Sequence, residues 1–252
     1  MESREFDNIK EYNKIIHAWD TVISIRAHYV ESDGIVADDI VKLERKLEEH
    51  VSLIDEIFST FKEGSVISKV NKGLLSEAEA RYKYKEFNEV YDLALRAREV
   101  TRGLFQFEQS EGLDFNAIVK GYSAQEMLNI VKDSIRRPVS IMVNAGGDCA
   151  IESYKEINVG LTDPDDISKI YQSVAISRGG VSTSGTYIRG AHIKSKDVPF
   201  LSASVWGPDP AMADAYATAA LLTKDLNLSW LPRDYQYSIV PNPQSRVIYQ
   251  NP

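Results

Sequence analysis

The hydrophobic pattern of this 252-residue chain changes near Pro138, and the change limits the folds open to it. Before Pro138, apolar residues recur at spacings of three and four, the period of an amphipathic helix. After it, short β-branched runs alternate with turn residues, which is typical of strands. Helices early and strands late predict an α+β fold with helices packed on an antiparallel or mixed sheet. We expect residues 1–18 to be a lead-in and residues 19–252 to form a single domain.

Four segments have a helical pattern bounded by start or stop residues. The helices expected are 38–58, begun by Asp38 or Asp39; about 76–101, ended by Gly103; one from near Ala117 to before Pro138, capped by Asp114 or Asn116; and 210–222, with Asp209 as cap and Pro210 in its first turn.

Alternating and β-branched runs give the expected strands. They are 21–29, 139–143, 149–153, 157–161, 172–176, 186–193, 202–205 and a closing hairpin of 235–240 with 246–249.

The net charge of −8, without a Lys/Arg cluster, argues against nucleic acid and anionic membranes as partners. The one cysteine, Cys149, excludes an internal disulfide framework and a cysteine-based zinc site. The sequence contains no apolar signal region and no run long enough to span a membrane. These features predict a soluble, cytoplasmic protein.

Asp214 and Thr218 lie four residues apart on the Ala-rich segment 210–222, and so on one face of a helix. A carboxylate and a hydroxyl in this arrangement form a hard-oxygen pair suited to Mg²⁺ or Ca²⁺. The same pair also fits an ordinary solvated helix face. Lys120 lies near the start of another expected helix, where free N–H groups and a lysine together would form an anion site, for example for phosphate. The alternative interpretation is an ordinary surface lysine on a capped helix.

Two turns carry further candidates. In Asn144-Ala-Gly-Gly-Asp148, adjacent glycines permit close approach of a ligand to the backbone, or simply a tight hairpin. The second turn, Thr183-Ser-Gly185, is rich in hydroxyls, and His192 follows it, where a general base would reach a substrate. A structural histidine is the alternative. The sequence contains no nucleophile elbow, P-loop or dinucleotide-binding fingerprint.

Read in order, these stretches resemble the ApbE family of FAD:protein FMN transferases, formerly called thiamine-biosynthesis lipoproteins. The motifs that carry the resemblance cover roughly residues 19–222. They are Trp19-Asp-Thr21, Phe58-Ser59, Ser65 to Asn71, Leu113-Asp-Phe-Asn-Ala-Ile-Val-Lys-Gly-Tyr122, Asn144-Ala-Gly-Gly-Asp148, Gly160-Leu-Thr-Asp-Pro164, Thr183-Ser-Gly185, His192-Ile193 and Ala213-Asp-Ala-Tyr-Ala-Thr218.

The resemblance implies an enzyme that binds FAD and Mg²⁺, cleaves the pyrophosphate, and passes FMN to a Thr or Ser hydroxyl of an acceptor flavoprotein, releasing AMP. It also implies roles for individual residues. Asp214, Thr218 and the carbonyl of Ala117 would ligate the metal; Lys120 and His192 would be catalytic; and Tyr122, Asn144, Gly146, Gly147, Asp148, Thr183, Ser184 and Gly185 would line the flavin-nucleotide site.

Three departures from the family pattern bear on activity. The usual Ile-Asp-Pro after the histidine is replaced by Ile193 followed by Lys194-Ser-Lys-Asp-Val-Pro199. Phe105-Gln-Phe-Glu108 stands where Phe-Asp-Pro-Thr is usual, and Gln125 stands where an acid often follows the Lys-Gly-Tyr motif. Two alternatives to the transferase therefore stay open: an FAD pyrophosphatase that uses water and yields FMN and AMP, and a flavin carrier without turnover.

Overall fold

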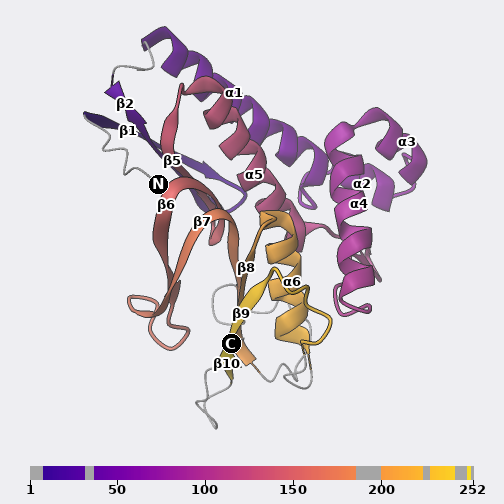
Figure 1. Ribbon diagram of the computed structural model, residues 1–252. Helices are drawn as coiled ribbons and strands as arrows, with labels where there is room; N and C mark the ends of the chain where they lie inside the picture. The colour runs from indigo at the N-terminus through magenta and orange to yellow at the C-terminus, as the bar shows by residue number, and fades with distance from the viewer. Residues whose placement is uncertain (1–7, 32–36, 186–199, 224–227, 242–248, 251–252) are drawn as a thin grey trace.

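The computed structural model describes residues 8–31, 37–185, 200–223, 228–241 and 249–250. Within these ranges, eight strands form one antiparallel sheet in the order β1-β2-β5-β6-β7-β8-β9-β10, and helices lie against it (Figure 1). The predicted α+β fold is confirmed. The strands are β1 (Ile9–Ala18), β2 (Thr21–Val30), β5 (Pro138–Ala145), β6 (Asp148–Thr162), β7 (Ile170–Gly185), β8 (Phe200–Gly207), β9 (Gln236–Pro241) and β10 (Tyr249–Gln250), with β3 (Glu108–Gln109) and β4 (Gly112–Leu113) in a small separate sheet.

Six helices lie along the described part of the chain. They are α1 (Ala37–Phe58), α2 (Val66–Asn71), α3 (Glu77–Lys83), α4 (Lys85–Val100), α5 (Asn116–Ser134) and α6 (Pro210–Leu222). Asp38 and Asp39 fall inside the first turn of α1, where acidic side chains favour the positive end of the helix dipole, and neither precedes the helix as a cap. No helix among the described residues combines the length and the apolar character needed to cross a bilayer.

Strand β1 is an element that the sequence pattern did not reveal. It pairs with β2 along its whole length, from Ile9 opposite Val30 to Ala18 opposite Thr21. Its alternation is blurred because only Tyr12 is fully buried, while the apolar Ile9 and Ile15 are exposed. The residues before Trp19 therefore include the outermost strand of the main sheet.

The single helix expected over 76–101 is wrong, because the chain breaks at Tyr84. Tyr84 has extended backbone angles (φ −120°, ψ 106°), so it ends α3 and precedes α4. A capping box between Ser76 and Glu79 starts α3. The inner face of α4 is apolar, and its buried residues are Phe87, Val90, Tyr91, Ala94 and Ala97.

The late strands are longer than their sequence runs. The runs 149–153 and 157–161 belong to one strand, β6, which has an irregular register against β7 between Glu152 and Ile157. β9 and β10 pair antiparallel, with Tyr249 opposite Ile239, as the expected closing hairpin requires. The strand expected at 186–193 lies outside the described residues.

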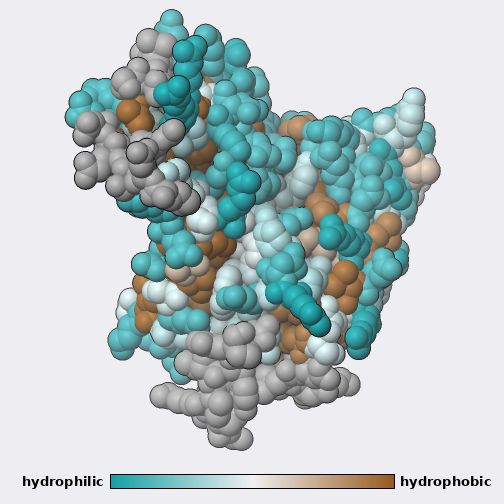
Figure 2. All heavy atoms as spheres, viewed as in Figure 1, coloured by the Kyte–Doolittle hydropathy of each residue, from teal (hydrophilic) through white to brown (hydrophobic). Residues whose placement is uncertain are grey.

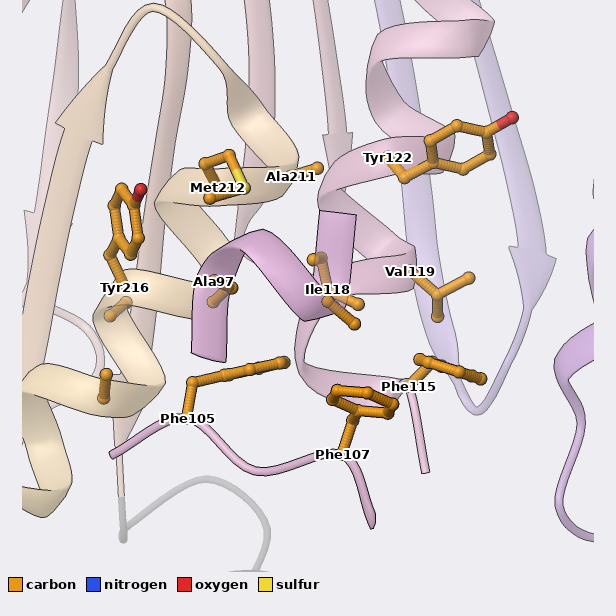
Figure 3. Close-up of a cluster of buried hydrophobic side chains, with 14 of the residues drawn as sticks. Ala97, Phe105, Phe107, Phe115, Ile118, Val119, Tyr122, Ala211, Met212 and Tyr216 are labelled. Atoms are coloured by element: carbon orange, nitrogen blue, oxygen red, sulfur yellow. The ribbon is translucent and has the colours of Figure 1, made fainter. Parts of the chain in front are cut away.

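Helix α6 is buried on all sides, because Ala and other small residues let neighbouring elements approach its backbone. Asp209 caps it by accepting hydrogen bonds from the N–H groups of Ala211 and Met212, as predicted. Figure 3 shows side chains of α5 and α6 converging, with Phe105, Phe107 and Phe115 beside them. These aromatic rings pack closely, and the centroids of Phe107 and Phe115 lie 5.4 Å apart.

The two faces of the sheet differ. One face packs against the helices and contributes Ala203 and Val205 to the largest hydrophobic cluster. Residues that alternate with these, such as Cys149, Ile151 and Val181, form a smaller cluster of their own. Figure 2 shows mostly hydrophilic residues on the visible surface, with hydrophobic ones between them, in keeping with the net charge of −8.

Candidate active site

One lysine and two carboxylates meet where α5, β6 and α6 come together. Lys120 of α5 forms an ion pair with Asp148 at the start of β6, and its Nζ lies 3.6 Å from Oδ2 of Asp214 on α6. The side chains of Asp148 and Asp214 are 2% and 4% exposed, and that of Lys120 is 17% exposed. Three residues predicted as site residues from distant parts of the sequence are thus brought together in a nearly dry environment.

The Gly-Gly turn places Asp148. Ala145 pairs with Asp148, so Gly146 and Gly147 form the two-residue loop of the β5–β6 hairpin, with φ of +69° and +106°. Such a loop requires positive φ at both positions, which glycine adopts without strain. The Oδ1 atom of Asn144 accepts a hydrogen bond from the N–H of Gly147 at 2.7 Å. The tight hairpin, one of the two interpretations of this motif, is confirmed, and it directs Asp148 towards Lys120.

Asp214 does not lie on a solvated helix face. It is buried, and its Oδ2 accepts a hydrogen bond of 3.4 Å from the N–H of Gly121. Burial and, to a lesser extent, the charge of Asp148 raise the pKa of Asp214 to about 7, although the charge of Lys120 opposes both effects. The carboxylate is therefore held where its negative charge is costly unless a cation is near.

Two glycines allow α6 to lie this deep. A Cβ on Gly121 of α5 would meet the backbone of Pro210 and would lie 2.9 Å from Cα of Ala211. A Cβ on Gly180 of β7 would also collide with Pro210. The first turn of α6 is thus held between α5 and β7. Neither Gly121 nor Gly180 was among the predicted site residues, because the sequence around a glycine in a helix or strand does not indicate which backbone packs against it.

The hydroxyl pair one turn along α6 extends the site. Thr218 Oγ1 and Ser184 Oγ lie 2.9 Å apart, joining α6 to β7. Thr183 is turned to the other face of the sheet, where its Oγ1 lies 2.8 Å from Ser204 Oγ. Gly185 is the last described residue of β7. His192 lies outside the described residues.

The start of α5 is irregular. Phe115 is its N-terminal flanking residue and makes no side-chain cap, whereas Asp114 Oδ1 accepts a hydrogen bond from the N–H of Asn116 at 2.9 Å. Ala117 has non-helical backbone angles (φ −89°, ψ 20°), which mark a kink. A kink of this kind turns a carbonyl away from the regular helical ladder, as a backbone ligand to a cation requires.

The side chain of Tyr122 points towards α4 and away from α6. Its hydroxyl donates a 2.6 Å hydrogen bond to Oε2 of Glu89 on α4, and Figure 3 shows its ring directed away from Met212 and Tyr216 of α6. Burial, followed by the hydrogen bond to Glu89, raises the pKa of Tyr122 far above its ordinary value. Tyr122 therefore joins α5 to α4, a packing role that was not anticipated for it.

The donor set fits a hard cation. Among the described residues, the cluster places two carboxylates against Lys120, which leaves an excess of negative charge. Its other polar groups are hydroxyls and carbonyls, and these oxygens suit Mg²⁺, which takes few protein ligands and completes its shell with water or phosphate. The described residues contain no group of three or more His, Cys, Asp and Glu side chains positioned to hold a metal without such help.

Comparison with known proteins identifies the family of this chain. The model of the ApbE family matches residues 106–236, which is more than half of the chain and includes Lys120, Asp148 and Asp214. The chain belongs to the ApbE family. A search of curated proteins found no match to it.

Solved structures of ApbE proteins share its fold at low sequence identity. A histidine-to-glycine mutant of the flavin transferase ApbE from Vibrio cholerae superposes with a TM-score of 0.76 at 12% identity, covering 96% of this chain and 97% of the other. The ApbE protein from Thermotoga maritima gives 0.74 at 18% identity, with coverages of 96% and 97%. The flavinyl transferase ApbE from Pseudomonas stutzeri, in its apo form, gives 0.71 at 15% identity, with coverages of 99% and 96%.

Proposed function

We propose that this ApbE-family chain is a Mg²⁺-dependent FAD:protein FMN transferase, which moves FMN from FAD to a Thr or Ser hydroxyl of an acceptor flavoprotein and releases AMP. The observation that carries the proposal is the buried cluster of Lys120, Asp148 and Asp214, built from the part of the chain that matches the ApbE family. Solved relatives whose names describe them as flavin transferases support the same activity.

Each residue of the cluster has a proposed task. Asp214, Thr218 and the carbonyl of Ala117 would hold Mg²⁺, which when bound supplies charge neutralisation for the non-bridging phosphate oxygens. Lys120 would bind the pyrophosphate of FAD, and Asp148 would keep the lysine ammonium directed towards it. Asn144, Gly146 and Gly147 would approach the nucleotide through the hairpin turn, and Thr183, Ser184 and Gly185 would lie on the flavin side.

The reaction exchanges one phosphorus–oxygen bond for another. The acceptor hydroxyl oxygen bonds to the phosphorus of the FMN half, and the bond from that phosphorus to the bridging oxygen breaks, so that AMP leaves with the bridging oxygen. We propose His192 as the base that takes the hydroxyl proton, because it occupies the matching position in the family motif. Burial of the cluster excludes water, which would strengthen the attraction between the ammonium group of Lys120 and the phosphates.

The altered sequence after His192 gives one reason to consider a second activity. If this altered segment does not bind an acceptor, water takes the place of the hydroxyl, and the products are FMN and AMP without a labelled protein. This FAD pyrophosphatase differs from the transferase only in the nucleophile.

The test is incubation of the purified protein with FAD and Mg²⁺, with and without an acceptor flavoprotein domain, while AMP and protein-bound flavin fluorescence are followed. We expect AMP together with a covalently fluorescent acceptor. AMP and free FMN without labelling would indicate the pyrophosphatase.

Intact bound FAD under both conditions would contradict both enzymes and leave a flavin carrier. The Asp214→Ala variant separates the carrier from the enzymes independently. A carrier loses little flavin affinity with this change, whereas an enzyme that depends on the cation loses its rate.

A further inference from the structure

Within the described part of β7, one buried hydroxyl lacks a partner although the two residues after it have one. Ser182 on β7 is 0% exposed, and its Oγ has no hydrogen-bond partner among the residues that the structure describes. The residues that follow it are both satisfied, Thr183 by Ser204 and Ser184 by Thr218. Because burying an unpaired hydroxyl costs free energy, such a group in a native site calls for a specific explanation.

The register of the sheet shows which way Ser182 points. Ser182 lies opposite Val205 on β8, and Ser184 lies opposite Ala203. Directly opposed residues share a face, and both Val205 and Ala203 belong to the hydrophobic cluster that includes α6. Ser182 therefore points towards α6.

Two contacts fix the height of Ser182 along that helix. Two residues before it, Gly180 lies so close to Pro210 that a Cβ would not fit. Two residues after it, Ser184 contacts Thr218 at 2.9 Å. Two residues of strand advance about as far as four residues of helix, so the strand and the helix run side by side here. Ser182 thus lies level with the turn of α6 that carries Asp214, midway between Pro210 and Thr218.

We propose that Ser182 is a positioning residue for Asp214: with a cation bound, its hydroxyl donates a hydrogen bond to the carboxylate and holds it in the orientation that binds the cation. Oδ2 of Asp214 contacts both the N–H of Gly121 and the ammonium group of Lys120. A carboxylate that ligates a metal is itself held by hydrogen bonds from its surroundings. On the β7 side, Ser182 offers a donor that no described residue uses. The inference rests on the proposed function, since it assumes the cation site at Asp214.

The chain provides a matched control. Ser202 on β8 is also 0% exposed, and its hydroxyl also lacks a partner within the described part of the chain. It lies opposite Gly185 and alternates with Ala203, so it points away from α6. Replacing either serine by alanine removes one unpaired buried hydroxyl and should not lower the thermal stability of the metal-free protein. Only Ser182→Ala should change cation binding.

The experiment is titration with Mn²⁺ alone, followed by the loss of the free Mn²⁺ EPR signal, for the wild type and for Ser182→Ala, Ser202→Ala and Asp214→Ala. We expect Asp214→Ala to abolish site binding, Ser182→Ala to weaken it about tenfold, and Ser202→Ala to leave it unchanged. The Ser182→Cys variant has a side chain of similar size with a weaker hydrogen-bond donor, so it should bind Mn²⁺ with intermediate affinity. It tests the role of Ser182 even if the alanine variant does not fold.

The outcomes separate the two claims. If Asp214→Ala binds Mn²⁺ as tightly as the wild type, or the wild type binds none, the proposed cation site is wrong, and the role of Ser182 falls with it. If Asp214→Ala loses binding while Ser182→Ala keeps it, or if both serine variants weaken it equally, the role of Ser182 alone is wrong.

Discussion

Lys120 stands between two carboxylates that would otherwise repel each other in a nearly dry setting. Its ion pair with Asp148 involves side chains that are 17% and 2% exposed, so solvent screens it little. Removing one partner of a buried pair leaves uncompensated charge, which is much costlier than loss of an exposed pair. The lysine therefore contributes to folding as well as to the proposed chemistry.

Replacement of Lys120 by Met should accordingly destabilise the protein. We expect Lys120→Met to lower the free energy of unfolding by roughly 3 kcal/mol in urea denaturation. Lys132→Met on the same helix is the control, because its bridge to Glu152 joins side chains that are 43% and 28% exposed. A change of less than about 1 kcal/mol is expected there. Equal effects of the two variants would contradict the buried pair.

The thiol of Cys149 provides a check on the interior of the sheet. Burial, with the charge of Asp148 in addition, raises the pKa of Cys149 to about 12. The reactive thiolate is therefore scarce and shielded. In the native protein at about pH 8, a thiol reagent should react with Cys149 orders of magnitude more slowly than in the denatured chain. Rapid labelling without denaturant would show that this part of the sheet opens readily.

His50 gives stability a dependence on pH. Its Nε2 lies 2.8 Å from Ser123 Oγ, and burial lowers the pKa of His50 from 6.5 to about 4. Between these two pH values the unfolded chain binds more protons at His50 than the folded chain does. The contribution of neutral, buried His50 to the free energy of unfolding is therefore full above pH 6.5 and is lost as the pH falls towards 4. The loss should be on the order of 2 kcal/mol, reduced by partial exposure of the ring. Urea denaturation of wild type and His50→Gln across this range should show a shallower pH dependence in the variant.

At the scale of elements, the proposed site depends on how closely α5, α6 and β7 approach one another. Gly121 on α5 and Gly180 on β7 let both elements pack directly against Pro210 of α6. This close packing determines how deeply Asp214 is buried. Neither glycine has a chemical task, yet both determine where the acidic group lies.

Gly121→Ala should therefore force α5 and α6 apart. The added methyl group meets backbone atoms, which do not yield as a side-chain end does, and we expect a loss of about 1–3 kcal/mol in unfolding free energy together with a loss of cation binding. Gly64→Ala is the control, because a Cβ at Gly64 would meet no atom of the described residues within 4 Å. Unchanged stability of Gly121→Ala would mean that the helices are not in close contact.

The sequence pattern predicted these elements unevenly, for physical reasons. The strong period of α1 and the Asp209-Pro210 start of α6 are local signals, and both helices formed as expected. Tyr84 gives no local sign of a break, since Tyr is acceptable in a helix, and β1 exposes apolar residues that obscure its alternation. Tyr122 was assigned to the flavin-nucleotide site by motif, whereas its hydroxyl bonds to Glu89 on another helix, a contact that depends on tertiary packing.

At the scale of the whole molecule, one antiparallel sheet gathers motifs that lie far apart in the sequence. Asp148 starts β6 after the hairpin, Ser184 lies near the end of the described part of β7, and Asp214 lies on the helix that follows β8. Lys120 comes from the helix that crosses to β5. The structural agreement with ApbE proteins over 96% of the chain, at 12–18% identity, shows that this frame persists while most of the sequence differs.

The central claim is that FAD is cleaved at the Lys120–Asp148–Asp214 cluster with the help of a cation. The most direct measurement is the rate of AMP release from FAD with Mg²⁺ and an acceptor domain, compared between the wild type and Asp214→Asn, with FAD binding followed in parallel. The account predicts steady AMP release by the wild type and a loss of about a hundredfold or more in the variant, with FAD binding largely kept. AMP release at the wild-type rate by Asp214→Asn would contradict it.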